Sequence, residues 1–183
     1  IFTLLFSNNY FHLSRNFNLQ KVGNLDWLKE DYNFKNISAY IDELIVLDVS
    51  KNNKDIKTLS NNIGDICKDC FVPISIGGGI DNLDKVKILL KAGADKIVVN
   101  SAVFKNKKFI YQLSKYIGSQ SIVISIDYKK GDNDYLFFIS NGNEQVKLNS
   151  LTFFKYINEI PAGEIYLNSI DRDGTGQGLD FDI

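Results

Sequence analysis

Two neighbouring segments carry the residue types that bind phosphate groups through the protein backbone. One apolar run ends in Gly78 and Gly79, and the next apolar run ends in Asn100 and Ser101. Small residues after a buried strand leave backbone N–H groups open beside the following helix, where an anion can bind. Since the two junctions lie one strand–helix–strand unit apart, we expect one phosphate group to be held between them. A tight turn without a ligand is the alternative for the glycines.

Polar side chains close or follow the predicted strands at the same end. They are Asp48, Asn100, Asp127, Asn168, Asp171 and Asp173. Asp127 follows the apolar run 123–126, and apolar surroundings raise the pKa of a carboxyl group, so Asp127 is the candidate for proton transfer. For any one of these aspartates, a helix cap or a loop turn is the alternative. The loop 169–178 contains Gly174 and is rich in glycine and charge, which is typical of a mobile substrate loop.

Three charged residues stand at the opposite ends of alternate predicted strands. Glu43, Lys96 and Glu164 open the second, fourth and sixth of these strands. In a closed barrel the even-numbered strands contribute to the same interior layer, so we expect an ionic ring at the bottom of the barrel. Two carboxylates that face one ammonium group need further positive charge. The alternative is that all three side chains point outwards into solvent.

No group of residues predicts a metal or a cofactor. His12 is the single histidine and has no partner by spacing, and the loop 169–178 lacks the later oxygen ligands of an EF-hand. Cys67 and Cys70 are spaced C-x-x-C, but they follow a helical stretch instead of opening one. A reduced cysteine pair is therefore favoured over a redox or metal role.

Strand-like and helix-like segments alternate along the chain. Strands are expected at residues 1–6, 44–49, 72–76, 96–99, 121–126 and 164–168. Helices are expected at residues 25–39, 55–68, 83–92, 107–116 and 151–159, and hairpins at residues 8–17 and 135–148. Apolar residues run almost without interruption through the strands, which indicates a parallel sheet covered on both faces and predicts an α/β protein.

Within that class the choice is between an open doubly wound sheet and a (β/α)8 TIM barrel. The first turn lacks the G-x-G-x-x-G pattern of dinucleotide-binding sheets, which favours the barrel. Barrels of this kind usually need about 250 residues. The 183 residues therefore predict one incomplete barrel domain, residues 1–183, which holds strands one to six.

The composition excludes several classes of protein. A formal net charge of −1 and 44% hydrophobic residues are typical of a globular protein, whereas a nucleic-acid binder needs clustered Lys and Arg. No apolar run reaches the roughly 20 residues that span a bilayer, and the first residues carry no basic leader. Together with the reduced cysteine pair, these features lead us to expect a cytoplasmic protein without nucleic-acid or membrane contact.

Five segments together resemble the cyclase subunit of imidazole glycerol phosphate synthase. They are residues 41–48 (IDELIVLD), 76–80 (IGGGI), 93–100 (GADKIVVN), 118–120 (GSQ) and 163–175 (GEIYLNSIDRDGT). The similarity follows the chain in order and covers essentially its whole length. It implies a (β/α)8 barrel that forms a heterodimer with a glutaminase. The glutaminase releases ammonia into the bottom of the barrel, and a phosphorylated sugar-type substrate binds at the top.

The resemblance also implies roles for individual residues, without a cofactor. The gate of the ammonia passage corresponds to Glu43, Lys96 and Glu164. The first phosphate site corresponds to Gly79, Asn100 and Ser101. Asp127 matches one of two catalytic aspartates, Asp173 matches a substrate-contacting position, and Asp95 matches an acidic residue at the glutaminase interface.

The chain departs from the family pattern near its first strand. The second catalytic aspartate of the family closes that strand, and Phe6 stands in its place. Ser14 stands where the family has Lys, and Asn168 stands where it usually has Thr. Acid–base cyclisation needs two groups on opposite sides of the substrate, so a phenyl ring at position 6 is expected to abolish that route.

Three functions remain open. The first is a histidine-biosynthesis lyase that forms imidazole glycerol phosphate from a phosphoribosyl precursor and ammonia. The second is a relative that keeps the ammonia passage but serves the amidination of acetamido sugars in surface-polysaccharide biosynthesis. The third is a non-catalytic scaffold that activates a glutaminase. The retained Asp127 opposes the scaffold, and Phe6 favours the second function over the first.

Overall fold

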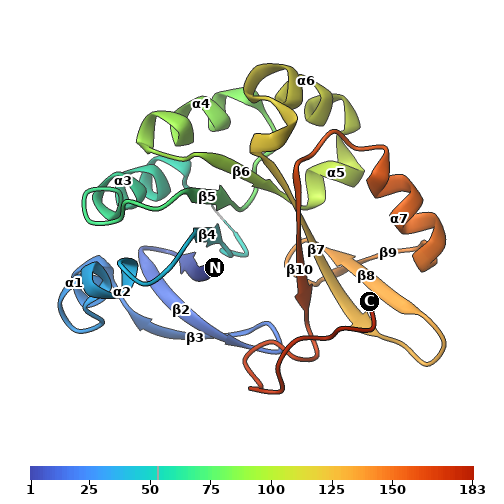
Figure 1. Cartoon of the computed structure of the whole chain (residues 1–183), viewed down its shortest axis with the longest axis horizontal. Helices are drawn as coiled ribbons and strands as arrows, with labels where there is room; N and C mark the ends of the chain where they lie inside the picture. Colours follow the sequence, from blue (N-terminus) through green and yellow to red (C-terminus); the bar gives the residue numbers. More distant parts are fainter. Residues whose placement is uncertain (53) are drawn as a thin grey trace. The chain divides into compact units, whose positions relative to one another are not determined.

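The computed structural model describes residues 1–52 and 54–183, which divide into two compact units. Unit 1 consists of Ile1–Leu13 and Gln20–Val98, and unit 2 consists of Ser14–Leu19 and Val99–Ile183. Each unit has its own strands and helices (Figure 1). That the chain forms one incomplete barrel domain stays a prediction.

Unit 1 is built on parallel strands that are largely buried. These strands are β1 (Phe2–Ser7), β4 (Leu44–Asp48), β5 (Ile74–Gly77) and β6 (Lys96–Val99). They lie side by side in the order β1-β4-β5-β6. The antiparallel strands β2 (Tyr10–Arg15) and β3 (Asn18–Gly23) extend the sheet beyond β1. The register pairs Phe6 with Asp48, which places both residues at the carboxyl edge of the parallel strands.

Amphipathic helices follow the strands of unit 1. The helices α3 (Ile56–Ile66) and α4 (Leu83–Ala92) pack against each other beside β5 and β6 (Figure 1). Each begins at a polar residue whose side chain accepts a hydrogen bond from the first turn, Asp55 in α3 and Asn82 in α4. Gly93 ends α4 with a φ of 112°, a left-handed conformation that glycine adopts without strain.

The single helix that we predicted at residues 25–39 is two helices. The helices α1 (Leu25–Glu30) and α2 (Phe34–Ser38) are separated by residues 31–33, and the last of these, Asn33, has a left-handed φ of 52°. A left-handed residue cannot continue a right-handed helix, and asparagine tolerates this conformation better than most residues. The prediction of one continuous helix is therefore wrong.

Unit 2 is built on one long strand, β7 (Ile122–Lys130). The strand β10 (Glu164–Ser169) pairs with β7 in parallel, and the hairpin of β8 (Tyr135–Ile139) and β9 (Glu144–Val146) pairs with it through β8 in antiparallel orientation. The helices are α5 (Ser101–Lys105), α6 (Lys107–Ile117) and α7 (Ser150–Asn158), with a 3-10 turn at Ser119–Ser121. The rings of Phe137 and Phe153 stack 3.7 Å apart, which fastens the hairpin to α7.

Two predicted strand boundaries are corrected by hairpin pairing. We expected the fifth parallel strand to end at residue 126, but β7 continues to Lys130 because its second half pairs with β8. Asp127 therefore lies inside a strand instead of after one. The hairpin that we expected at residues 8–17 is shifted, because β2 turns into β3 through Asn16 and Phe17, which both have left-handed φ angles.

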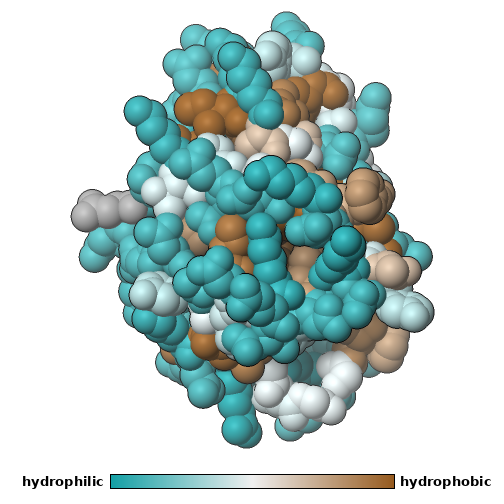
Figure 2. All heavy atoms as spheres, turned by 90° about the vertical axis from the view of Figure 1, so that its left-hand side faces the viewer, coloured by the Kyte–Doolittle hydropathy of each residue, from teal (hydrophilic) through white to brown (hydrophobic). Residues whose placement is uncertain are grey.

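The alternation of strands and helices confirms the predicted α/β class with parallel strands. Figure 2 shows a face that is mainly hydrophilic, with separate apolar areas between the polar side chains. Among the described residues, no helix combines the length and the apolar character that crossing a membrane requires. Cys67 and Cys70 carry free thiols, and burial raises the pKa of both, which opposes thiolate chemistry.

Candidate functional site

Asp127 lies at the centre of a buried polar cluster in unit 2. The residue is 6% exposed. Asn100 Nδ2 donates a hydrogen bond of 3.2 Å to Asp127 Oδ2, and Asn168 Nδ2 donates one of 3.2 Å to Asp127 Oδ1. Asn168 faces Asp127 because the parallel register of β10 and β7 pairs these two residues. Three polar residues that we selected at strand ends therefore meet in one cluster.

The electrostatics of this cluster suit proton transfer. Burial raises the pKa of the Asp127 carboxyl to about 6, because the charged form loses its water. The hydrogen bonds from Asn168 and Asn100 act in the opposite direction, since they stabilise the charged form. A pKa close to neutrality allows a carboxyl group to take up and release a proton in each turnover.

The raised pKa of Asp127 also predicts how pH changes stability. Between about pH 4 and pH 6 the folded state keeps a proton on Asp127 that the unfolded state has lost, so the free energy of unfolding falls as pH rises. At pH 7 the loss amounts to about 3 kcal/mol, since each pKa unit corresponds to roughly 1.4 kcal/mol. Urea unfolding of the wild type and of Asp127→Asn at several pH values measures this effect. A stability difference between the two proteins that does not change with pH would contradict the prediction.

The β8–β9 hairpin orients Asn100, and we did not predict this contact from the sequence. The N–H of Ser140 donates to Asn100 Oδ1 at 3.3 Å and to Ser101 Oγ at 3.0 Å. Because Ser140 occupies Oδ1, the Nδ2 group of Asn100 faces Asp127. The Asn-Gly step at residues 141–142 was the only signal in the sequence, and it predicted the turn but not its contact with Asn100.

In unit 1 the glycine turn after β5 is flanked by two lysines that we did not single out from the sequence. Gly78 and Gly79 have left-handed φ angles of 110° and 73°. A Cβ on Gly78 would lie 2.3 Å from the carbonyl oxygen of Asp48, and a Cβ on Gly79 would lie 2.6 Å from Cδ of Lys54. Lys85 Nζ donates to the carbonyl oxygen of Gly79 at 2.8 Å. This turn requires glycine. Lys85 also pairs with Asp81 at 3.0 Å, and Lys54 Nζ donates to the carbonyl oxygen of Asp48.

The predicted phosphate site draws on both units. Gly78 and Gly79 belong to unit 1, whereas Asn100 and Ser101 belong to unit 2. The joint binding of one phosphate by these residues therefore stays a prediction.

Two members of the predicted ionic ring form a pair in unit 1. Lys96 Nζ lies 2.7 Å from Glu43 Oε1, and the two side chains are only 17% and 26% exposed. Their contact opposes the alternative in which the side chains point separately into solvent. Glu164 belongs to unit 2, so the ring with all three members stays a prediction.

Asp173 is bound to the turn between β2 and β3 within unit 2. Its Oδ2 accepts a hydrogen bond of 2.5 Å from Ser14 Oγ and one of 2.9 Å from the N–H of Phe17. Gly174 follows with a φ of 66°, and a Cβ there would lie 2.0 Å from the carbonyl oxygen of Ser14. The turn therefore ties down the first half of the loop that we expected to be mobile, and a substrate contact of Asp173 stays a prediction.

Phe6 and Asp48 line a cavity of about 220 Å³ at the carboxyl edge of β1 and β4. The other lining residues are Asn8, Asn9, Ser50, Asp55 and Thr58. Phe6 is 3% exposed and packs edge-on against Phe11, with ring centroids 5.7 Å apart. Asp48 Oδ1 accepts a hydrogen bond from the N–H of Ser50. This cavity is where the family resemblance implies a second catalytic carboxylate.

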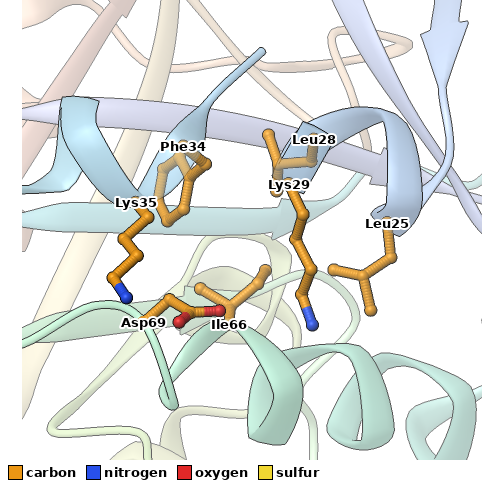
Figure 3. Close-up of a pocket in the computed structure, with 7 residues that line it drawn as sticks. All are labelled: Leu25, Leu28, Lys29, Phe34, Lys35, Ile66 and Asp69. Atoms are coloured by element: carbon orange, nitrogen blue, oxygen red, sulfur yellow. The ribbon is translucent and has the colours of Figure 1, made fainter. Parts of the chain in front are cut away.

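Two other features of unit 1 lie away from these groups. Asp95 binds the N–H of Ile74 through Oδ2 at 2.8 Å, which fixes the start of β5, and its contact with a glutaminase stays a prediction. A second cavity, of about 170 Å³, lies between α1, α2 and the end of α3. Figure 3 shows Lys35 reaching from α2 towards Asp69, and Lys29 reaching down from α1 on the other side of Ile66. None of the described residues that we selected for chemistry lines this cavity.

Comparison with known proteins agrees with the resemblance seen in the sequence. A family model described as histidine biosynthesis protein matches residues 29–183. The chain is 40% identical over 183 residues to a protein of Parasynechococcus marenigrum (strain WH8102) that is provisionally named imidazole glycerol phosphate synthase subunit hisF2. That alignment covers 100% of this chain and 68% of the relative.

Two further relatives are named imidazole glycerol phosphate synthase subunit HisF. The chain is 39% identical to the protein of Sulfolobus acidocaldarius and 41% identical to that of Natranaerobius thermophilus, over 142 residues in each case. Each alignment covers 78% of this chain and 57% of the relative. The chain therefore spans between 57% and 68% of the length of these three relatives.

Proposed function

Since the chain belongs to the family of histidine biosynthesis proteins, we propose that it is the cyclase-like subunit of a glutamine amidotransferase complex. In this proposal a glutaminase partner releases ammonia from glutamine, and the subunit uses the ammonia on a phosphorylated sugar-type substrate. The observation that carries the proposal is the Asp127 carboxyl. It is buried, bonded to Asn100 and Asn168, and has a pKa of about 6, which suits a group that moves a proton during the attack of ammonia.

In this proposal, residues of unit 1 supply further parts of the function. The Glu43–Lys96 ion pair supports a gate through which ammonia enters, with Glu164 as its third member. The glycine turn at Gly79, with the Lys85 ammonium group on its carbonyl oxygen, supports an anion site for the substrate phosphate. Asp95 is the proposed contact with the glutaminase in a heterodimer.

A second candidate function is favoured by the position of Phe6. Its ring is buried at the end of β1 against Phe11, where cyclisation would need a carboxylate. A subunit with one proton-transfer group can still deliver ammonia to a simpler acceptor. We therefore propose amidination of an acetamido sugar in surface-polysaccharide biosynthesis as the alternative, with the same glutaminase partner.

A turnover assay separates these two functions. The complete protein is combined with its glutaminase and supplied with the phosphoribosyl precursor and ammonium, and the release of imidazole glycerol phosphate is measured. Because one of two acid–base groups is replaced by a phenyl ring, we expect turnover at least about 100-fold below that of a cyclase with both carboxylates. Turnover at the rate of such a cyclase would show that Phe6 does not impair the reaction. A parallel assay with a nucleotide-linked acetamido sugar tests the alternative.

A further inference from the structure

The cavity of about 170 Å³ in unit 1 has an apolar interior. Leu28, Phe34 and Ile66 line it from α1, α2 and α3, and none of the three is more than 2% exposed. A water molecule in a cavity needs roughly two to four polar partners, which these side chains do not offer. Since an apolar cavity of about 150 Å³ can hold one benzene molecule, this space suits one ring or one short branched chain.

The interrupted helix at residues 31–33 leaves room for this cavity. Because Asn33 has a left-handed φ of 52°, α1 and α2 are separate helices, and Leu28 and Phe34 approach Ile66 from different ones. The lining residues come from both helices and from the end of α3, so the cavity lies within unit 1 alone.

Two ammonium groups border the apolar interior. Lys29 and Lys35 lie on opposite sides of Ile66 (Figure 3). Within residues 1–52 and 54–183, neither lysine side chain forms an ion pair or a hydrogen bond. Asp69 is the one carboxylate on the lining, and Lys35 reaches towards it (Figure 3). The lining therefore carries an excess of one positive charge.

The nearest carboxylate on α3 does not cancel this excess. Asp65 Oδ1 is paired with Lys68 Nζ at 2.6 Å. Lys68 is the main cause that lowers the pKa of Asp65, and the charge of Lys29 contributes less. Lys29 thus acts on Asp65 only from beyond ion-pair distance, and its ammonium group can still bind an anion.

We infer that this cavity binds a small carboxylate whose apolar part is one ring or one short branched chain. The apolar part fills the space beside Leu28, Phe34 and Ile66, and the carboxylate lies beside the ammonium groups of Lys29 and Lys35. A neutral molecule of the same shape gains no charge-assisted hydrogen bond there. None of the lining residues takes part in the proposed function, so the two are tested separately.

Phenylacetate tests this site, because it joins one ring to one carboxylate. Methyl NMR of the complete protein follows Leu28 and Ile66 as phenylacetate is added. We expect saturable shifts with a dissociation constant of about 1 mM, the order of magnitude for about ten non-hydrogen atoms. Phenylacetamide has the same ring without the charge, and we expect it to bind at least about tenfold more weakly. Acetate, which lacks the ring, should also bind at least about tenfold more weakly.

Three variants locate the binding in the cavity. Leu25→Phe enlarges a half-buried lining residue and should abolish the shifts. Lys29→Gln should weaken binding of phenylacetate by about tenfold. Lys57→Gln makes the same change in the first turn of α3, away from the lining, and should leave binding unchanged. Equal binding of phenylacetate and phenylacetamide by the wild type, or of phenylacetate and acetate, would overturn the inference. The absence of saturable shifts at Leu28 and Ile66 would overturn it as well.

Discussion

Replacing Asp127 by asparagine is expected to lower ammonia-dependent product formation by about 10²–10⁴-fold, the contribution that a positioned acid–base group makes. The amide of the new residue has nearly the shape of the carboxylate but cannot accept a proton at neutral pH. The reaction catalysed by the glutaminase partner should keep its rate, because Asp127 is buried in unit 2 and belongs to the acceptor chemistry. The two rates are measured together in the complete complex, as glutamate release and product release.

The matched control is Asp134→Asn, which makes the same change of charge in the same unit. Asp134 is an exposed residue of the β7–β8 turn that binds Ser150 at the start of α7. We expect that variant to retain product formation. Unchanged product formation in Asp127→Asn, with an active glutaminase, would favour the non-catalytic scaffold over both catalytic functions.

The sequence was informative about Asp127 because its signal is local. The four residues before Asp127 are mostly apolar, and a carboxylate that follows an apolar run is expected to be buried and to have a raised pKa, even though β7 continues beyond Asp127. The structure agrees on both points. The parallel strands were predictable for the same reason, since runs of apolar residues bounded by polar turns are typical of buried strands.

The contacts of Asp127 were not predictable, because they depend on residues far apart in the chain. Asn168 is 41 positions away from Asp127, and it faces Asp127 only through the register of β10 on β7. Ser140 reaches Asn100 only because the β8–β9 hairpin folds back towards α5. Polar residues at strand ends can be selected from the sequence, but the partners of each one are set by tertiary packing.

Local conformations that depend on one residue were missed for a different reason. Asn33 divides a helix by adopting a left-handed φ, yet asparagine also occurs inside helices, so its type alone does not predict the break. The stem of Lys54 covers Gly79, although the two residues are in different loops. Burial lowers the pKa of Lys54. No pattern in the sequence predicts that this side chain is buried.

Replacing Phe6 by aspartate is expected to lower the free energy of unfolding by at least about 3 kcal/mol, as removal of a buried aromatic ring does. Phe6 is 3% exposed and packs on Phe11, so the variant loses a well-packed ring at the end of β1. The new carboxylate would also lie beside Asp48, its register partner on β4, and repulsion between the two would add to the loss. Urea unfolding of the complete protein measures this change.

The same replacement is expected to raise turnover of the phosphoribosyl precursor by about 100-fold or more, provided that the loss of Phe6 is what impairs cyclisation. The new side chain would face the cavity that Phe6 and Asp48 line, and Asp48 beside it would raise its pKa towards the range of a general acid. Phe6→Asn is the matched control, because it removes the same ring and adds a polar group without a charge. Equal turnover in Phe6→Asp and Phe6→Asn, at equal folded fractions, would show that a carboxylate at this position is not what the cyclisation lacks. A rise in Phe6→Asp alone would place a second proton-transfer group at the end of β1.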